Sequence, residues 1–233
     1  MKKEKSIVIF RSLFLLIGWF SVIGSITLKI MKWYSQGEGA IMGLLDSLSH
    51  YTIQTNILVL AWLTLAVIGN LRKGESKVVN TVYKSGITLY ISFTFIIYAL
   101  ILQQLWAPTG IHRVLAVITH YVTPIVFILD WFFCEFIKDR EEKQKLSNVI
   151  KWLIYPFCYA AYVVLIYGKF TGRYMYPFLH IPSIGYSGVL IRVLVLSVCY
   201  ILMGLFIIKI SRIIQGNIRS PFNSKNKSNE KTL

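Results

Sequence analysis

Cysteine and acidic residues are scarce in this chain of 233 residues. It has three cysteines, Cys134, Cys158 and Cys199, and 10 acidic residues against 25 Lys and Arg. All three cysteines fall inside apolar segments, where isolated thiols act as packing residues, so neither a disulfide framework nor a cysteine metal site is expected. The shortage of acidic residues leaves a net charge of +15, which raises the question of a nucleic-acid partner.

The placement of the basic residues argues against nucleic acid. They form no basic domain and no platform of basic and aromatic side chains. Instead, 18 of the 25 lie at the two chain ends and on alternate connectors between apolar segments. Short loops rich in Lys and Arg stay in the cytoplasm, so we expect a plasma-membrane protein with both termini cytoplasmic. Topology and attraction to anionic lipid headgroups then account for the charge.

Long apolar segments dominate the chain, whose hydrophobic fraction is 55% and whose mean hydropathy is +0.60. A spanning helix needs about 20 mostly apolar residues. Six segments meet this length, near 7–28, 44–70, 86–105, 114–137, 149–167 and 189–210. The sequence therefore predicts an all-α polytopic membrane protein with six transmembrane helices in one bundle, forming a single domain at 1–214. A disordered basic cytoplasmic tail is expected at 215–233, which is rich in Ser, Asn and Lys.

Two further absences narrow the class of membrane protein that the sequence predicts. No small-x-small cleavage site follows the first apolar segment, so it is interpreted as a retained span and not as a secretory signal. No internal repeat is evident, which argues against an inverted-repeat transporter. Arg11 lies inside the first span near its cytoplasmic end, where a long side chain is expected to reach back to the headgroups.

Polar residues interrupt two of the spans, and such residues usually face the interior of a bundle. The clusters are Asp46, Ser47, Ser49, His50, Tyr51, Thr52, Gln54, Thr55 and Asn56, and then Thr119, His120, Tyr121, Thr123, Asp130 and Trp131. Thr52 lies 20 residues before Arg72, and His120 lies 18 before Lys138. Both are therefore roughly 27–30 Å above the inner boundary, near the outer edge of the hydrocarbon.

A hydroxyl beside an imidazole can serve as a nucleophile with its general base, the minimum needed for acyl transfer. The structural alternative is that Thr52 bonds to its own helix while His120 bonds across the bundle. Asp130 lies about 15 Å along the helix from His120, too far to orient the imidazole. We expect it either to pair with a polar group of another span or to titrate in a separate site. No two histidines have i, i+4 spacing, so neither metal nor another cofactor is expected.

Three segments resemble a known group of proteins: 50–56 (HYTIQTN), 120–131 (HYVTPIVFILDW) and 155–178 (YPFCYAAYVVLIYGKFTGRYMYPF). They look like those of bacterial six-pass integral membrane proteins, which are distantly similar to the androgen-induced family of membrane hydrolases. Members of that family hydrolyse fatty acid esters of hydroxy fatty acids with a membrane-embedded threonine and histidine. The resemblance implies Thr52 as the threonine and His120 as the histidine, with Thr55 as an alternative to Thr52.

The leading hypothesis is therefore a lipid-ester hydrolase whose site lies near the outer leaflet, with Thr52 as nucleophile and His120 as base. Gln54, Asn56 or backbone N–H groups are candidates for stabilising the oxyanion, and membrane lipids are the expected partners. The alternative hypothesis is a component that binds or transports a small molecule or lipid without turnover. It predicts an outward pocket that reaches Asp130.

Overall fold

The computed structural model describes residues 2–72, 79–134 and 144–229, and within them the protein is helical with no strand. Six helical stretches in these residues are long and apolar enough to cross a bilayer. They are Glu4–Ser35, Tyr51–Leu71, Thr81–Leu105, Gly110–Phe133, Ser147–Thr171 and Ile181–Ile214. The prediction of an all-α protein with six membrane spans is confirmed.

Several spans change their helical winding along their length. The elements are α1 (Lys2–Ser35), α2 (Ala40–Leu48), α3 (Tyr51–Leu71), α4 (Thr81–Ile97), the π-helical η1 (Tyr98–Leu102), α5 (Gln103–Leu105), α6 (Gly110–Val117), the π-helical η2 (Ile118–Val122), α7 (Thr123–Cys134), α8 (Ser147–Ala161), the π-helical η4 (Tyr162–Tyr167), α9 (Gly168–Thr171), the 3₁₀ turn η5 (Pro177–Leu179) and α10 (Ile181–Asn229). Span three is α4–η1–α5, span four is α6–η2–α7 and span five is α8–η4–α9.

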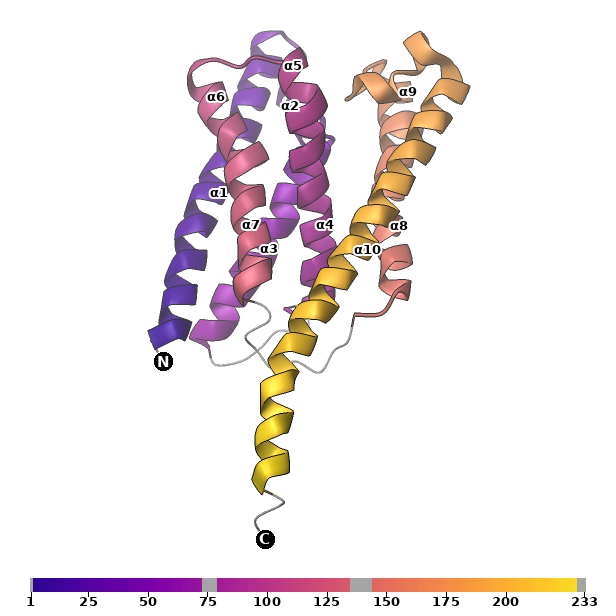
Figure 1. Cartoon of the computed structure of the whole chain (residues 1–233). Helices are drawn as coiled ribbons and strands as arrows, with labels where there is room; N and C mark the ends of the chain where they lie inside the picture. The colour runs from indigo at the N-terminus through magenta and orange to yellow at the C-terminus, as the bar shows by residue number, and fades with distance from the viewer. Residues whose placement is uncertain (1, 73–78, 135–143, 230–233) are drawn as a thin grey trace.

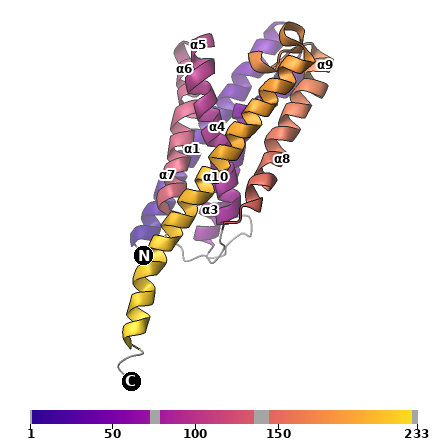
Figure 2. The same ribbon diagram turned by 45° about the vertical axis from the view of Figure 1, so that its right-hand side comes forward.

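The bundle has two parts, as Figures 1 and 2 show. Helices α1, α3, α4 and α7 pack side by side, whereas α8 pairs with α10, and this pair packs on α4 and bonds through tyrosine side chains to the start of α3. Both termini lie at the same end, as an even number of crossings requires. We call the opposite end, which carries α2, α5 and α9, the far end. From the basic connectors we predict that the far end lies outside the cell, and the structure does not test this orientation.

The C-terminal segment is helical in the structure as far as Asn229. Helix α10 continues to Asn229 and so runs through most of 215–233, where composition predicts a disordered segment. Residues 230–233 lie outside the described residues. Disorder of this basic segment in water stays a prediction.

The second span begins later than predicted. The expected span 44–70 breaks at His50, whose backbone is extended (φ −80°, ψ 126°), so that α2 ends before α3 begins. The break is possible because other groups satisfy the polar residues there. The Ser49 hydroxyl bonds to the Leu45 carbonyl and to the Tyr162 hydroxyl, each at 2.7 Å. Helix α2 instead lies close against α1, where a Cβ on Gly43 would come within 2.7 Å of the Ile30 Cα.

Two prolines lie inside spans four and five and interrupt their helical hydrogen bonds. Pro124 has no N–H to bond to the carbonyl of His120, and the chain winds through the wide turn of η2 just before it. Pro156 likewise cannot bond to the carbonyl of Trp152. The Tyr90 hydroxyl donates to this freed carbonyl at 2.8 Å, so its hydrogen bond is restored from a neighbouring helix.

A buried group of charges joins three spans toward the terminal end. Asp130 accepts from the Arg11 Nε at 2.9 Å and from the Lys84 Nζ at 2.6 Å. Lys84 is fully buried and its ammonium lies 4.4 Å from the centre of the Trp62 ring. The expectation that Arg11 reaches back to the headgroups is wrong, because a carboxylate inside the bundle is a nearer partner. Of the two roles open to Asp130, the ion pair is the one observed.

This arrangement predicts that Asp130→Asn destabilises the protein strongly. Removing one partner leaves Lys84 and Arg11 buried without their shared carboxylate, a change that costs about 3–5 kcal/mol in comparable buried pairs. Thermal unfolding in detergent measures the effect, with the exposed Lys151→Met on α8 as control. An Asp130→Asn protein that melts with the wild type would contradict this account.

Candidate functional site

Thr52 lies in the first turn of α3, where the backbone N–H groups have no partner within the helix. His50, the residue before the helix, provides no side-chain cap. Instead the Tyr51 N–H donates to two tyrosine hydroxyls, that of Tyr159 at 3.0 Å and that of Tyr176 at 3.1 Å. The start of α3 is thus fixed from α8 and from the segment 172–180, which precedes α10.

His120 lies in η2, and its neighbours fix both the orientation of its ring and the ring nitrogen that carries the hydrogen. The ring stacks on Tyr98 of η1, with centroids 3.7 Å apart and planes at 18°. Its Nδ1 lies 2.9 Å from the carbonyl of Ala116. A carbonyl can only accept, so Nδ1 carries a hydrogen, and in the neutral ring Nε2 is then an acceptor.

The acceptor nitrogen of His120 points at Thr52. The distance between Nε2 and the Thr52 Oγ1 is 3.3 Å, so the hydroxyl donates to the imidazole. This is the contact that a nucleophile and its general base require, at the long distance common without substrate. The two residues come from different spans, and the structure brings them together at one level of the bundle, while their depth in the membrane stays a prediction.

Thr55, the alternative threonine, lies elsewhere. Its hydroxyl donates to the Thr52 carbonyl at 3.2 Å and lies 2.9 Å from the Thr94 hydroxyl. It has no contact with His120 among the described interactions. Thr52 is therefore the threonine that the imidazole can activate.

The two candidate oxyanion donors have other bonds. Asn56 is fully buried, and its Nδ2 donates to the Thr52 carbonyl at 2.8 Å and to the Thr119 carbonyl at 3.0 Å. Gln54 donates through Nε2 to the Leu48 carbonyl at 2.8 Å. Asn56 therefore joins the backbone of Thr52 to the backbone of Thr119, next to His120, and Gln54 bonds to the last carbonyl of α2.

Asp130 is not part of this site. It lines only a small cavity near Arg11 and Phe127, separate from the cavities that contain Thr52. The expectation of an outward pocket that reaches Asp130 does not match the described cavities.

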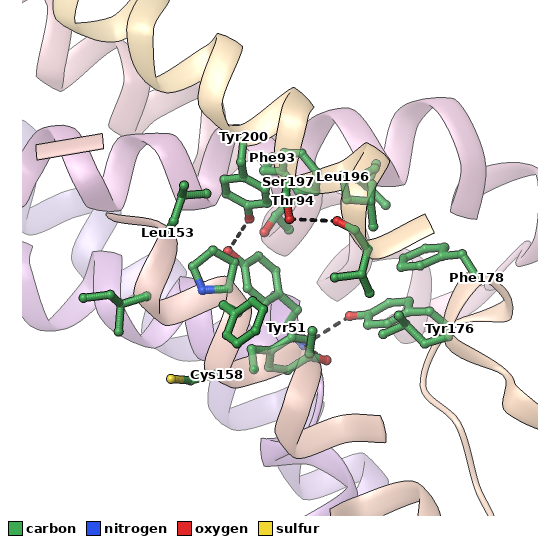
Figure 3. Close-up of a pocket in the computed structure, with 18 of the residues that line it drawn as sticks. Tyr51, Phe93, Thr94, Leu153, Cys158, Tyr176, Phe178, Leu196, Ser197 and Tyr200 are labelled. Carbon is green, nitrogen blue, oxygen red and sulfur yellow. Dashed lines mark hydrogen bonds between the residues drawn. The ribbon is translucent and has the colours of Figure 1, made fainter. Parts of the chain in front are cut away.

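Thr52 lies on the wall between two cavities. One, of about 350 Å³, lies between α3 and α4 on one side and α8 and α10 on the other. Figure 3 shows Tyr51 between Tyr200 and Tyr176 in this cavity. No charged side chain lines it, and most of its walls are apolar. We call it the apolar cavity.

The second cavity, of about 660 Å³, is more polar than the first and lies toward the far end. It is lined by Lys29, Lys32, His50, His112 and His120, and no Asp or Glu of the described residues lines it. We call it the cationic cavity. The size of each cavity lies in the range of small-molecule sites.

An ion pair at the rim of the cationic cavity shapes its charges. Lys29 lies 2.8 Å from the Asp46 carboxylate, which also accepts from the Tyr167 hydroxyl. Burial raises the pKa of Asp46, but the bonds from Lys29 and Tyr167 outweigh it and leave that pKa below its usual value. Burial and the Lys29 cation lower the pKa of His50, which favours its neutral ring at pH 7.

Sequence reasoning did not single out Tyr98 or Tyr176 for the site. Each is an aromatic residue near the membrane boundary, where Tyr is a common anchor. The aromatic and proline-rich run at 172–188, which includes Tyr176, was the available signal. What distinguishes Tyr176 is that it lines both cavities and bonds to the Tyr51 N–H beside Thr52, and this follows from the fold.

Comparison with known proteins adds no assignment. No family model, no curated protein and no solved structure matches the chain. The likeness to bacterial six-pass proteins and to the androgen-induced hydrolases therefore stays a prediction from the three quoted segments, and the geometry of the site is the basis for any function.

Proposed function

We propose that the protein is an integral plasma-membrane hydrolase of lipid esters, with both termini cytoplasmic and the site near the outer leaflet. Thr52 is the nucleophile and His120 the general base. A distant kinship with the androgen-induced membrane hydrolases, through bacterial six-pass proteins, is part of this proposal.

One observation carries the proposal: the Thr52 hydroxyl lies 3.3 Å from the nitrogen of His120 that can accept its proton. The Ala116 carbonyl holds the other nitrogen, and Tyr98 holds the plane of the ring. A purely structural contact between a threonine and a histidine does not need the imidazole fixed in one tautomer. General-base catalysis does.

The two cavities support an amphiphilic ester as substrate. The apolar cavity suits an acyl chain, and its lining includes three exposed side chains of α8 that would face lipid: Ile150, Ile154 and Phe157. The cationic cavity suits an anionic group on the alcohol part. An ester that extends from one cavity into the other places its carbonyl at Thr52, on the shared wall.

The non-enzymatic alternative is less well supported. It predicts a pocket that reaches Asp130, so that protonation there couples to movement. Asp130 is instead paired with Arg11 and Lys84 away from both large cavities. A lipid-binding protein could use the same cavities, and turnover separates the two functions.

The proposal predicts that Thr52→Ala abolishes ester hydrolysis while Thr55→Ala retains it. The two threonines are one helical turn apart and both are buried, but only Thr52 contacts His120. Release of fatty acid from a long-chain ester by the purified protein measures the rate. Loss of the nucleophile or of its base is expected to reduce kcat at least 10³-fold, by analogy with serine hydrolases.

His120→Ala serves as the second variant, and thermal unfolding of each variant checks folding. Hydrolysis at the wild-type rate by folded Thr52→Ala protein would end the proposal. So would a wild-type protein that binds the ester and never turns it over.

Lys32 tests the substrate class. Lys32→Gln is expected to raise KM about two- to fivefold for an ester with a carboxylate or phosphate on its alcohol part, with kcat unchanged, because an exposed ion pair contributes little. A neutral ester of equal length should show no change. Lys169→Gln, at an exposed position outside both cavities, is the control. Equal effects of Lys32→Gln on both esters would contradict the anionic class.

A further inference from the structure

Acyl transfer at Thr52 needs a group that stabilises the negative charge on the ester carbonyl oxygen. The two side chains that the sequence suggests for this role, those of Asn56 and Gln54, already donate to other groups. Both hydrogens of the Asn56 amide are bonded to carbonyls, and the Gln54 amide bonds to the end of α2. The first-turn N–H groups of α3 are near Thr52, but a second donor that faces the cavity is still needed.

Tyr176 has the required position. Tyr176 is 8% exposed, it lines both cavities as Thr52 does, and its hydroxyl lies 3.1 Å from the backbone nitrogen of Tyr51, the residue before Thr52. Figure 3 shows this hydroxyl directed at the start of α3, where it accepts from the Tyr51 N–H.

The hydrogen of the Tyr176 hydroxyl is available for donation. The neighbouring Tyr159 hydroxyl uses its hydrogen on the Ser49 carbonyl at 2.8 Å, and the Tyr51 N–H donates to the Tyr176 oxygen, so neither bond uses the hydrogen of Tyr176 itself. Burial raises the pKa of Tyr176, and the hydrogen bond from the Tyr51 N–H offsets this only in part. The phenol therefore stays protonated.

We infer that Tyr176 is a catalytic residue that donates a hydrogen bond to the oxyanion formed at Thr52. This inference rests on the proposed hydrolase function. It makes the segment 172–180 part of the active site, since that segment carries the donor to the wall between the two cavities.

The reaction then proceeds in two steps, transfer of the acyl group to Thr52 and its hydrolysis by water. The Thr52 oxygen attacks the ester carbonyl, its proton passes to His120 Nε2, and the carbonyl electron pair moves to the oxygen that Tyr176 and a first-turn N–H of α3 stabilise. When the carbon–oxygen bond to the alcohol breaks, the alcohol takes the proton from His120. Water repeats the sequence, with His120 taking its proton and returning one to Thr52 as the fatty acid leaves. Tyr176 keeps its proton throughout.

The test is Tyr176→Phe in the full-length protein with a long-chain fatty acyl ester of a fluorogenic alcohol. Loss of one oxyanion donor typically costs about 10²–10³-fold in kcat, and we expect a loss of this size with KM changed less than twofold. Tyr159→Phe is the matched control, because its hydroxyl accepts from the same Tyr51 N–H and donates to the Ser49 carbonyl. It should keep kcat within a few-fold of wild type.

The outcomes separate this inference from the proposed function. If the wild type is active and Thr52→Ala is inactive, wild-type kcat in Tyr176→Phe overturns the role of Tyr176 alone. An equal loss in Tyr159→Phe overturns it too, since the effect is then one of helix support. A wild type without turnover overturns both proposals.

A second substitution covers the case in which Tyr176→Phe does not fold. 3,5-Difluorotyrosine at position 176 keeps the ring and the hydroxyl but makes the hydroxyl a stronger hydrogen-bond donor. Its kcat, measured below the pKa of the fluorinated phenol, should rise above that of wild type. An unchanged or lower kcat would count against donation to the oxyanion.

Discussion

The hydrogen bond from His120 to the carbonyl of Ala116 is the interaction on which the site depends. It leaves one nitrogen of the imidazole as an acceptor and directs it at Thr52. Without it, the same pair could exchange roles, and the threonine would accept a hydrogen instead of donating one. The carbonyl belongs to the same span as His120, four residues earlier, so a local feature of one helix determines what two spans can do together.

The bilayer also constrains the backbone around the site. Carbonyls and N–H groups must find partners inside the protein, because lipid provides none. Here side chains from other parts of the chain satisfy backbone groups that have no partner within their own helix. Tyr90 bonds to the carbonyl that Pro156 leaves free, and Tyr159 and Tyr176 accept from the first N–H of α3. Tyr159 and Tyr176 therefore stabilise the start of α3, which places Thr52 beside the two cavities.

Much of the fold could be predicted from the sequence, and the site in part. The lengths of the apolar segments and the positions of the basic connectors each depend on many residues together. They therefore predict six spans without knowledge of any tertiary contact. The depth of a residue can likewise be estimated by counting residues from the end of its span, and this count predicts Thr52 and His120 at one level. The break at His50 could not be predicted, because it depends on hydroxyls from α8 and 172–180. The pairing of Asp130 with Arg11 and the place of Tyr176 likewise depend on which faces of the spans meet, and a single sequence does not determine this.

The central claim is that the hydroxyl of Thr52 is nucleophilic. Reaction of the purified protein with a long-chain fluorophosphonate, followed by peptide mapping in a mass spectrometer, tests it directly. The account predicts a phosphonyl group on the oxygen of Thr52, formed as fluoride leaves, and no adduct when His120 is replaced by Ala. An adduct on another residue of the two cavities, or none on the folded protein, would contradict it.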